Sequence, residues 1–385
     1  MKTKKPKLLA KIAAAVFAGM LAFALTACKT DADSTTKYTV TYEFHDTVTS
    51  AGTTTIDGTD YDLVYFGDWP QTIKAESVLI DESNSKSVGL YTYYAGSDGN
   101  WYAKFLENAC YGLIYSDGTE PGHGHLARER YFKVEPIKWR VLNPNENGNK
   151  ILFAESVLTA NVVYYDYDWA HGVINRTIEG STIYPNNYKH SKIRAYLNGL
   201  SYEVKATDSD EQTTDTTYNE NGFLQTAFTQ SAQALIATTT VDNSEESTNP
   251  ASNSKAFNSG KNENICENTE DKIFLLSEKE ATTSDYGFTE YNVYGEGNSR
   301  TRSSTDFAKA NRAYDNPNCN WMLRSPCLGS SGRSELYIIS GAYGQASTDS
   351  YSYGVRVIKG IRDYVWDDNY SIVPALCVSA ENLPQ

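Results

Sequence analysis

The chain has 385 residues, enough for one large domain or two ordinary ones, and carries 34 basic against 48 acidic residues, a formal net charge of −14. Nucleic acid is not an expected partner of so acidic a chain, because contact with a phosphate backbone needs clustered Lys and Arg. The 29 tyrosines are the other compositional signal. A tyrosine combines a rigid apolar ring with a polar tip, which suits β-rich surfaces and molecular recognition.

Residues 1–27 have the pattern of a signal peptide. Five lysines precede an apolar run, Ile12–Ala27, that is too short to span a bilayer comfortably. The tetrapeptide Leu25-Thr26-Ala27-Cys28 resembles the lipobox of bacterial lipoproteins. That resemblance implies that the peptide is cut before Cys28 and that its thiol is lipidated, each buried CH₂ adding about 0.8 kcal/mol of membrane affinity. The mature body then has a charge of −19. A secreted protein without lipid is the alternative.

The chain begins with short polar and β-forming segments. Residues 28–37 are expected as the lipidated cysteine and its tether, and residues 38–60 as an N-terminal β extension. Within that extension, the alternation over Tyr38–Phe44 predicts a half-exposed strand. Tyr61–Phe66 is a further strand, which Gly67–Pro70 is expected to end. Two hairpins should follow, Val88–Tyr94 with Trp101–Phe105 and Tyr131–Leu142 with Lys150–Ala154.

The middle of the chain changes to a helical period, with apolar stripes, a glycine cap and a capping box. The segments 203–222 and 241–271 are polar and are expected as long loops of one domain, with linkers between two domains as the alternative. Strands return after Asn320. These elements predict an α+β fold of mixed antiparallel β with a few peripheral helices. The predicted helices are Tyr188–Asn198, Phe223–Ala237, a short one opened by Ser277-Glu278-Lys279-Glu280 after a buried strand over Lys272–Leu276, and Ser304–Ala313.

Apart from Cys28, the cysteines indicate neither zinc nor redox chemistry, because no CxxC pair occurs. Cys319 and Cys327 flank an expected strand, which would separate their Cα atoms by roughly 26 Å, beyond the reach of a disulfide. Most of the cysteines are expected as buried thiols. The other three are Cys110, Cys266 and Cys377.

Six short motifs occur in a characteristic order: Phe66–Gln71, Pro136–Leu142, Ile193–Asn198, Asp271–Ser277, Trp321–Pro326 and Val373–Leu376. Together they resemble a bacterial family known as domain of unknown function 6273, whose members are often exported lipoproteins. The resemblance covers about residues 61–380 and implies a C-type-lectin-like fold, in its formylglycine-generating-enzyme-like branch. The Glu-Pro-Asn and Gln-Pro-Asp triplets of calcium lectins are absent, and the paired redox cysteines have no convincing counterpart. These departures argue against calcium-dependent sugar binding and oxidase chemistry.

Two arginines stand inside apolar strands beside tryptophans, Arg140 after Trp139 and Arg324 after Trp321. A cation in such a place must be paired or must extend to water, because an unpaired buried charge costs several kcal/mol. These four residues are therefore expected to be structural, with ligand contact by the arginines as the alternative. Pro326 and Pro374 belong to the same structural motifs.

His123 and His125 are the most metal-like pair in the chain, but a metal site needs three or four converging ligands. Solvated loop histidines are the simpler interpretation, and no metal or other cofactor is expected. The acidic composition also offers no single pair of carboxylates that could be selected as a catalytic pair.

The segment from Cys327 to Ile372 has an unusual composition, with six Tyr, eight Ser, six Gly and four Asp. Tyrosine mixed with small polar residues is typical of antibody paratopes, where rings give contact area and small residues adapt their hydrogen bonds. Lectin-like domains related to the implied branch also display ligand-binding residues in the corresponding C-terminal segment. Ordinary tyrosine-rich hairpins are the alternative. The candidate ligand-binding residues are Tyr337, Tyr343, Tyr351, Tyr353, Arg362, Tyr364, Trp366, Asp367, Asn369 and Tyr370.

The expected function is therefore that of an exported protein, held to the bacterial membrane through Cys28, whose C-terminal hairpins bind a protein or glycan of the envelope or the surroundings. The outer membrane and the cell surface are the expected destination. One alternative is an enzyme on the same scaffold, a hydrolase or an oxidase. A structural envelope lipoprotein is the other.

Overall fold

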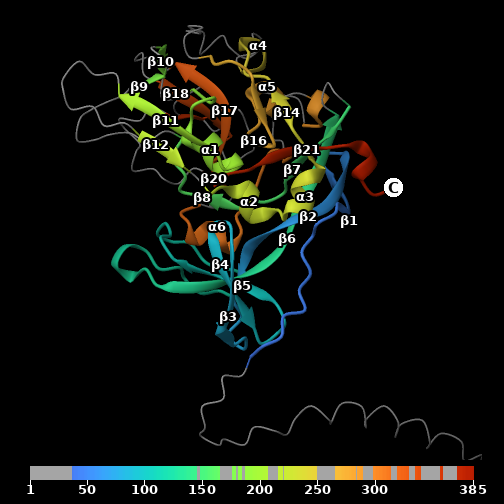
Figure 1. The fold of residues 1–385 in the computed structure, drawn as a ribbon. Helices are drawn as coiled ribbons and strands as arrows, with labels where there is room; N and C mark the ends of the chain where they lie inside the picture. The colour runs from blue at the N-terminus through green and yellow to red at the C-terminus, as the bar shows by residue number, and fades with distance from the viewer. Residues whose placement is uncertain are drawn as a thin grey trace, which may run out of the picture. The chain divides into compact units, whose positions relative to one another are not determined.

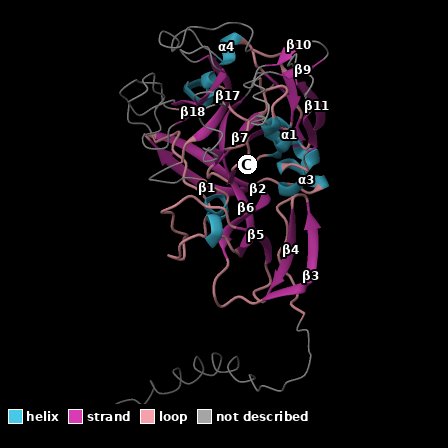
Figure 2. Cartoon of the chain, turned by 90° about the vertical axis from the view of Figure 1, so that its left-hand side faces the viewer, coloured by secondary structure: helices cyan, strands magenta, loops and turns pink. Residues whose placement is uncertain are grey.

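A computed structural model gives the fold, in which residues 37–385 form one compact unit. Strands dominate and the helices are short (Figure 1; Figure 2). The expected α+β class, built mainly of antiparallel strands with a few helices, is confirmed. The structure describes residues 37–144, 148–164, 176–178, 181–183, 187–206, 216–219, 221–248, 265–282, 284–288, 298–313, 319–328, 334–339, 356–358 and 371–385.

Ten of the described strands form the main sheet, which is organised around its longest strand, β6. β2 pairs with one edge of β6, while β5 and β7 share the other edge (Figure 1). Both predicted hairpins are present, as β4–β5 and β6–β7. The strands are β1 (Thr49–Ile56), β2 (Thr59–Ile73), β3 (Ile80–Val88), β4 (Tyr91–Gly96), β5 (Trp101–Leu106), β6 (Glu129–Pro144), β7 (Lys150–Ala154), β13 (Ile236–Ala237), β16 (Ile273–Phe274) and β21 (Ala375–Val378).

Strand β21, close to the C-terminus, lies inside this sheet. It pairs with β7 on one side and with β13 and β16 on the other, and all four of its residues are buried. The sheet thus joins the beginning, the middle and the end of the compact unit.

The segment over Tyr38–Phe44 is extended, but it is not the predicted strand. Its side chains alternate between half-buried and exposed, as the sequence indicates. Its backbone, however, bonds to turns and side chains: the Tyr38 amide donates to Asp81 Oδ2 (3.2 Å) and the Thr41 amide to the Gly99 carbonyl (2.9 Å). Because no neighbouring strand takes these bonds, no ladder forms before β1.

Strand β2 continues through Gly67–Pro70, where the sequence predicts its end. A bulge shifts the register there, with Gly67 at φ +69°. A Cβ on this glycine would lie 2.4 Å from the Phe228 ring, so only glycine fits. The extra residue allows both Phe66 and Trp69, three positions apart, to enter the core. The motif therefore bends the strand instead of ending it.

The first predicted helix is confirmed as α1 (Lys192–Asn198), which the Ser191 side chain caps and Gly199, at φ +66°, ends. The predicted capping box is also present, because the Glu280 amide donates to Ser277 Oγ and the Ser277 amide to Glu280 Oε2. The remaining helices are α2 (Phe223–Ala227), α3 (Gln230–Leu235), α4 (Glu245–Thr248), α5 (Glu278–Thr282) and α6 (Asp306–Ala310), with 3₁₀ turns at Gly124–Leu126, Ser284–Tyr286 and Ala380–Asn382.

The single helix predicted over Phe223–Ala237 is wrong, because the segment forms two helices and a short strand, β13. Phe228 is extended, at φ −131° and ψ 128°, and ends α2. Thr229 then caps α3 by accepting a hydrogen bond from the Ala232 amide. Phe228 thereby places its ring against Phe66, with ring centroids 5.1 Å apart. Packing of this ring outweighs continuation of the helix.

The two predicted long loops contain regular structure within their described parts. In segment 203–222, β11 pairs with β12, and β11 also pairs with β9 of a hairpin with β10. In segment 241–271, α4 lies between the paired strands β14 and β15. Threonine carries much of this β structure, since its branched side chain favours strands without large apolar surface. The strands are β9 (Arg176–Ile178), β10 (Ser181–Ile183), β11 (Ser201–Ala206), β12 (Thr216–Asn219), β14 (Thr239–Val241) and β15 (Thr269–Asp271).

The chain returns to β structure after Asn320, as predicted, and forms a second large sheet. Its strand order is β19–β18–β17–β20–β8. The strands are β8 (Thr159–Ala160), β17 (Trp321–Leu328), β18 (Ser334–Ile339), β19 (Arg356–Ile358) and β20 (Ser371–Ile372).

One large hydrophobic cluster joins the two large sheets. Trp69, Trp139 and Trp321 lie fully buried in it, and each indole N–H donates to a backbone carbonyl at 2.7–3.1 Å. A buried indole needs such a partner, because an unpaired N–H would be costly. Cys319 and Cys377 are also core residues, and Pro374 is buried between β20 and β21.

Candidate functional site

Of the ten candidate ligand-binding residues, the described part of the chain contains the backbone of one. Tyr337 lies in β18, with its Cα opposite that of Val357 in β19. The other nine candidates lie outside the described residues: Tyr343, Tyr351, Tyr353, Arg362, Tyr364, Trp366, Asp367, Asn369 and Tyr370.

The structure does describe where the end of this C-terminal segment joins the core. β17 and β20 pair in parallel, with Trp321 opposite Ser371, and the Ser371 amide donates to the Asn320 carbonyl (3.0 Å). The side chains of Trp321 and Ser371 are fully buried. The chain after this segment therefore rejoins the core beside the start of β17, and the described strands β18 and β19 extend the same sheet on the other side of β17.

Arg324 secures this attachment from within β17, where it is fully buried. Its guanidinium donates to both carboxylate oxygens of Glu280, at 2.5 and 2.7 Å. It also donates to the carbonyls of Leu275 (2.6 Å) and Asp242 (3.0 Å). Burial alone would lower the pKa of Arg324, but the adjacent carboxylate raises it above its ordinary value. The arginine thus joins β17 to three other segments and presents no surface to a ligand.

Arg140, in β6, has the same kind of environment. It donates to both carboxylate oxygens of Glu155, at 2.9 and 2.7 Å, and to the Ser299 carbonyl at 2.6 Å. Arg302 lies beside it, 4.0 Å from the same carboxylate, and burial together with the charge of Arg140 lowers the pKa of Arg302 to about 9. One carboxylate therefore serves two buried guanidinium groups. Arg140 is thus held within the core, as Arg324 is.

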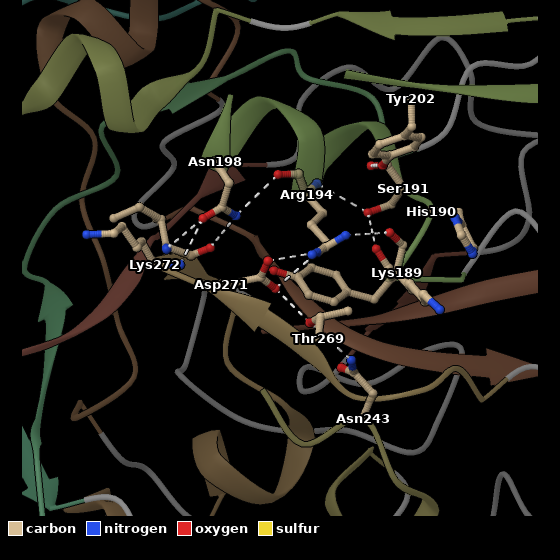
Figure 3. A network of polar contacts seen from close by, with 12 residues as sticks. Lys189, His190, Ser191, Arg194, Asn198, Tyr202, Asn243, Thr269, Asp271 and Lys272 are labelled. Atoms are coloured by element: carbon tan, nitrogen blue, oxygen red, sulfur yellow. Dashed lines mark hydrogen bonds and ion pairs between the residues drawn. The ribbon is translucent and has the colours of Figure 1, made fainter. Parts of the chain in front are cut away.

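A second polar network joins the start of α1 to β15 (Figure 3). Arg194 Nε lies 2.8 and 3.1 Å from the two oxygens of Asp271, and Thr269 donates to the second oxygen at 2.7 Å. Asp271 is fully buried, and burial raises its pKa even though the arginine opposes the shift. Arg194 also donates to the Lys189 carbonyl (3.0 Å), which fixes the turn that leads into the helix.

Asn198 closes the other end of α1 against β16 (Figure 3). Its side-chain oxygen accepts from the amides of Lys272 and Ile273, both at 3.0 Å, and its nitrogen donates to the Ile273 carbonyl at 2.8 Å. These contacts explain two of the sequence motifs, since one supplies this asparagine and the other supplies the strand that it binds.

His190 lies at the edge of this network (Figure 3). It is half-buried, and its ring packs edge-on against Tyr202 with centroids 6.1 Å apart. Burial, followed by the charges of Lys189 and Arg194, lowers the pKa of His190 to about 4. The imidazole is therefore neutral at physiological pH.

Asn243, like Tyr188, carries a buried side-chain oxygen that has no hydrogen-bond partner among the described residues. It is buried, and its side-chain nitrogen donates to the Glu267 carbonyl (3.1 Å) and to Thr269 (3.4 Å). Buried acceptors of this kind are commonly satisfied by an internal water molecule.

The metal candidates do not converge with other ligands. His123 is half-buried and packs against the Tyr111 ring, with centroids 5.3 Å apart, while His125 is exposed. Across the described ranges, no group of three or more His, Cys, Asp or Glu side chains is placed to hold a metal ion. Cys28 lies outside the described residues. None of the helices that the structure describes has the length and apolar character that a membrane crossing requires.

Sequence reasoning identified the buried Arg140 and Arg324 but not their partners, and it missed the buried Arg300 and Arg302. Glu155 lies 15 positions after Arg140, and Glu280 lies 44 positions before Arg324. Asp271 lies 77 positions after its partner Arg194. One signal was present, because Asp271 directly precedes the predicted buried strand Lys272–Leu276 in one of the six motifs, where an unpaired acid would be costly.

Comparison with known proteins gives one family. The model of a family described as a domain of unknown function (DUF6273) matches residues 147–378. The match contains four of the six motifs, while Phe66–Gln71 and Pro136–Leu142 precede it. No curated protein and no solved structure matches the chain.

Proposed function

Given that the chain belongs to the DUF6273 family, we propose that it is an exported lipoprotein that binds a protein or glycan through its C-terminal segment. Cleavage before Cys28 and lipidation of its thiol tether the compact unit to a bacterial membrane, and the outer membrane and cell surface are its destination. A C-type-lectin-like fold, in which C-terminal residues contact ligands, is the finer part of this proposal.

The observation that carries the proposal is the attachment of residues 329–370. The end of the segment returns to the start of β17, where Ser371 pairs with the buried Trp321, and its described parts extend the same sheet as β18 and β19. Arg324 joins β17 to Glu280, Leu275 and Asp242. Binding residues commonly lie on segments that a rigid scaffold positions, because less conformational entropy is then lost when the ligand binds. The Tyr, Ser, Gly and Asp content of the segment supplies the chemistry of a recognition surface.

The anchor is tested by labelling cells with palmitate. The wild-type chain should incorporate the label and the Cys28→Ala variant should not, and equal labelling would disprove lipidation. Protease treatment of intact cells then tests surface exposure, since a chain at the cell surface is degraded while a periplasmic control protein is protected.

Ligand binding is tested with the full-length lipidated protein on arrays of glycans and of purified extracellular proteins. A variant in which Tyr343, Tyr351, Tyr353 and Tyr364 are replaced by Ala should lose the signals that the wild type gives. The matched control replaces Tyr94, which is half-buried in β4 of the main sheet, and should retain them. If the tyrosine variant binds like the wild type at an unchanged melting temperature, the C-terminal segment is not the binding surface.

A further inference from the structure

The connection between β5 and β6 presents an apolar surface to solvent. Across the described ranges, five large hydrophobic side chains are exposed, and four of them fall within residues 106–128, here called the apolar loop. They are Leu106 (58% exposed), Tyr111 (83%), Ile114 (56%) and Leu126 (55%). Four exposed apolar side chains within one loop supply the kind of surface that protein or membrane contacts use.

The apolar loop is held in place by a buried carboxylate. Glu107 is fully buried and accepts hydrogen bonds from the Tyr115 hydroxyl (2.9 Å) and the Gly122 amide (2.8 Å). Arg130 donates to it at 3.2 Å, and Arg128 lies 3.5 Å away. A carboxylate with this many donors fixes both ends of the loop, so the outward side chains are displayed by a defined structure.

The loop also has an inner face of its own. Leu113 and Tyr115 are buried on either side of the exposed Ile114. The Asn108 amide donates to the Ala310 carbonyl (2.8 Å), and Lys309 donates to the Ile114 carbonyl (3.0 Å), which attaches the loop to α6. The loop therefore buries some of its apolar side chains, such as Leu113, while others, such as Ile114, remain in solvent.

A short series of contacts connects the base of the apolar loop to the point where the chain enters the compact unit. Near that point, Tyr38 bonds to Asp81 at the start of β3. The neighbouring Glu82 lies 3.4 Å from Lys104, which is also 2.9 Å from Glu129. Glu129 pairs with Leu106, the first residue of the loop. The apolar loop thus begins only a few side chains from the entry point.

The length of the tether limits how far this entry point lies from the acyl chains. Eight residues, Lys29–Thr36, separate Cys28 from Lys37. A fully extended chain spans at most about 3.6 Å per residue, so Lys37 lies within roughly 32 Å of the lipidated cysteine. The compact unit consequently stays next to the bilayer, and its exposed apolar loop can contact that bilayer.

We propose that the apolar loop rests on the bilayer that holds the acyl chains, with Tyr111 and the three aliphatic side chains at the level of the headgroups. This inference rests on the proposed lipidation of Cys28. Tyrosine is well suited to that interface, where its ring is apolar and its hydroxyl stays wet. The loop carries charges of both signs, including Asp117, Glu120 and Arg128. The contact is therefore apolar, and it does not require anionic lipid.

The experiment places the full-length lipidated protein in vesicles and measures tryptophan fluorescence. Tyr111→Trp introduces a probe at the tip of the loop, and Thr53→Trp introduces one at an exposed position of β1 as the matched control. Vesicles contain phosphatidylcholine with or without brominated chains, and a second series adds phosphatidylglycerol. The wild-type chain has six tryptophans of its own, and its emission is subtracted from that of each variant.

Brominated lipid should quench the additional emission of the Tyr111→Trp variant and leave that of Thr53→Trp unchanged, equally with and without phosphatidylglycerol. Adding Leu126→Asp to the Tyr111→Trp variant should remove most of the quenching. If the protein floats with the vesicles but Tyr111→Trp is not quenched, or both probes are quenched equally, the membrane contact is disproved while the anchor stands. If the lipidated preparation does not float, the anchor itself fails, and this inference fails with it.

Discussion

Replacement of Arg324 by methionine should destabilise the compact unit. The variant leaves the Glu280 carboxylate buried without its cation and removes the donor from two backbone carbonyls. Breaking a buried ion pair from one side costs about 3–5 kcal/mol. With an unfolding entropy of about 2.1 cal/mol/K per residue and roughly 350 residues, this loss lowers the melting temperature by roughly 4–7 °C.

Differential scanning calorimetry on residues 29–385 measures this shift, with Lys279→Met as the matched control. Lys279 precedes Glu280, and its nitrogen lies 3.7 Å from the exposed Glu246, so that pair contributes at most about 1 kcal/mol. Adding Glu280→Gln to Arg324→Met removes the unpaired charge and should restore part of the loss, by about 1–3 kcal/mol. A melting temperature of Arg324→Met within about 1 °C of the control would refute the assigned ion pair.

Three further variants test the fold and its pH dependence. Gly67→Ala should cost about 2 kcal/mol or more in urea denaturation, since its Cβ would lie 2.4 Å from Phe228 at φ +69°; a cost below about 0.5 kcal/mol would contradict the bulge. Asn198→Ala should cost about 3 kcal/mol by leaving backbone groups of Ile273 unpaired, and Asn198→Asp should recover only the acceptor contacts. Because His190 has its pKa lowered to about 4 from an unfolded value near 6.5, the unfolded state binds the proton first, and the wild type loses stability as pH falls through this range. The wild type should lose about 1–2 kcal/mol of unfolding free energy, after allowance for the partial exposure of His190, and His190→Gln should not show this loss. The measurement is the melting temperature of both proteins between pH 7.5 and 4.5, and the same change with pH in both would reject the prediction.

Local signals predicted the elements that depend on near neighbours. The hairpins follow from turn residues between alternating strands, and α1 follows from a serine cap and a terminal glycine. The capping box at Ser277 also needs only residues within one helical turn. In each case the partners lie within a few positions, so the sequence contains the whole interaction.

Elements decided by distant partners could not be read in the same way. The bulge in β2 depends on the ring of Phe228, and the same ring divides the helix predicted over Phe223–Ala237. The same holds for the candidate site. The sequence predicted that a buried arginine needs a carboxylate, but it did not identify Glu155 or Glu280 as that partner. Only the three-dimensional fold selects one acid among 48.

The position of β21 has a consequence for how the protein is made. Residues 375–378 occupy an interior place in the main sheet, between β7 on one side and β13 and β16 on the other. The sheet can therefore close only after residue 378 has been synthesised, and such long-range pairing is slow. Until then β7, β13 and β16 lack the strand that joins them, so the edges of these strands stay unpaired on that side.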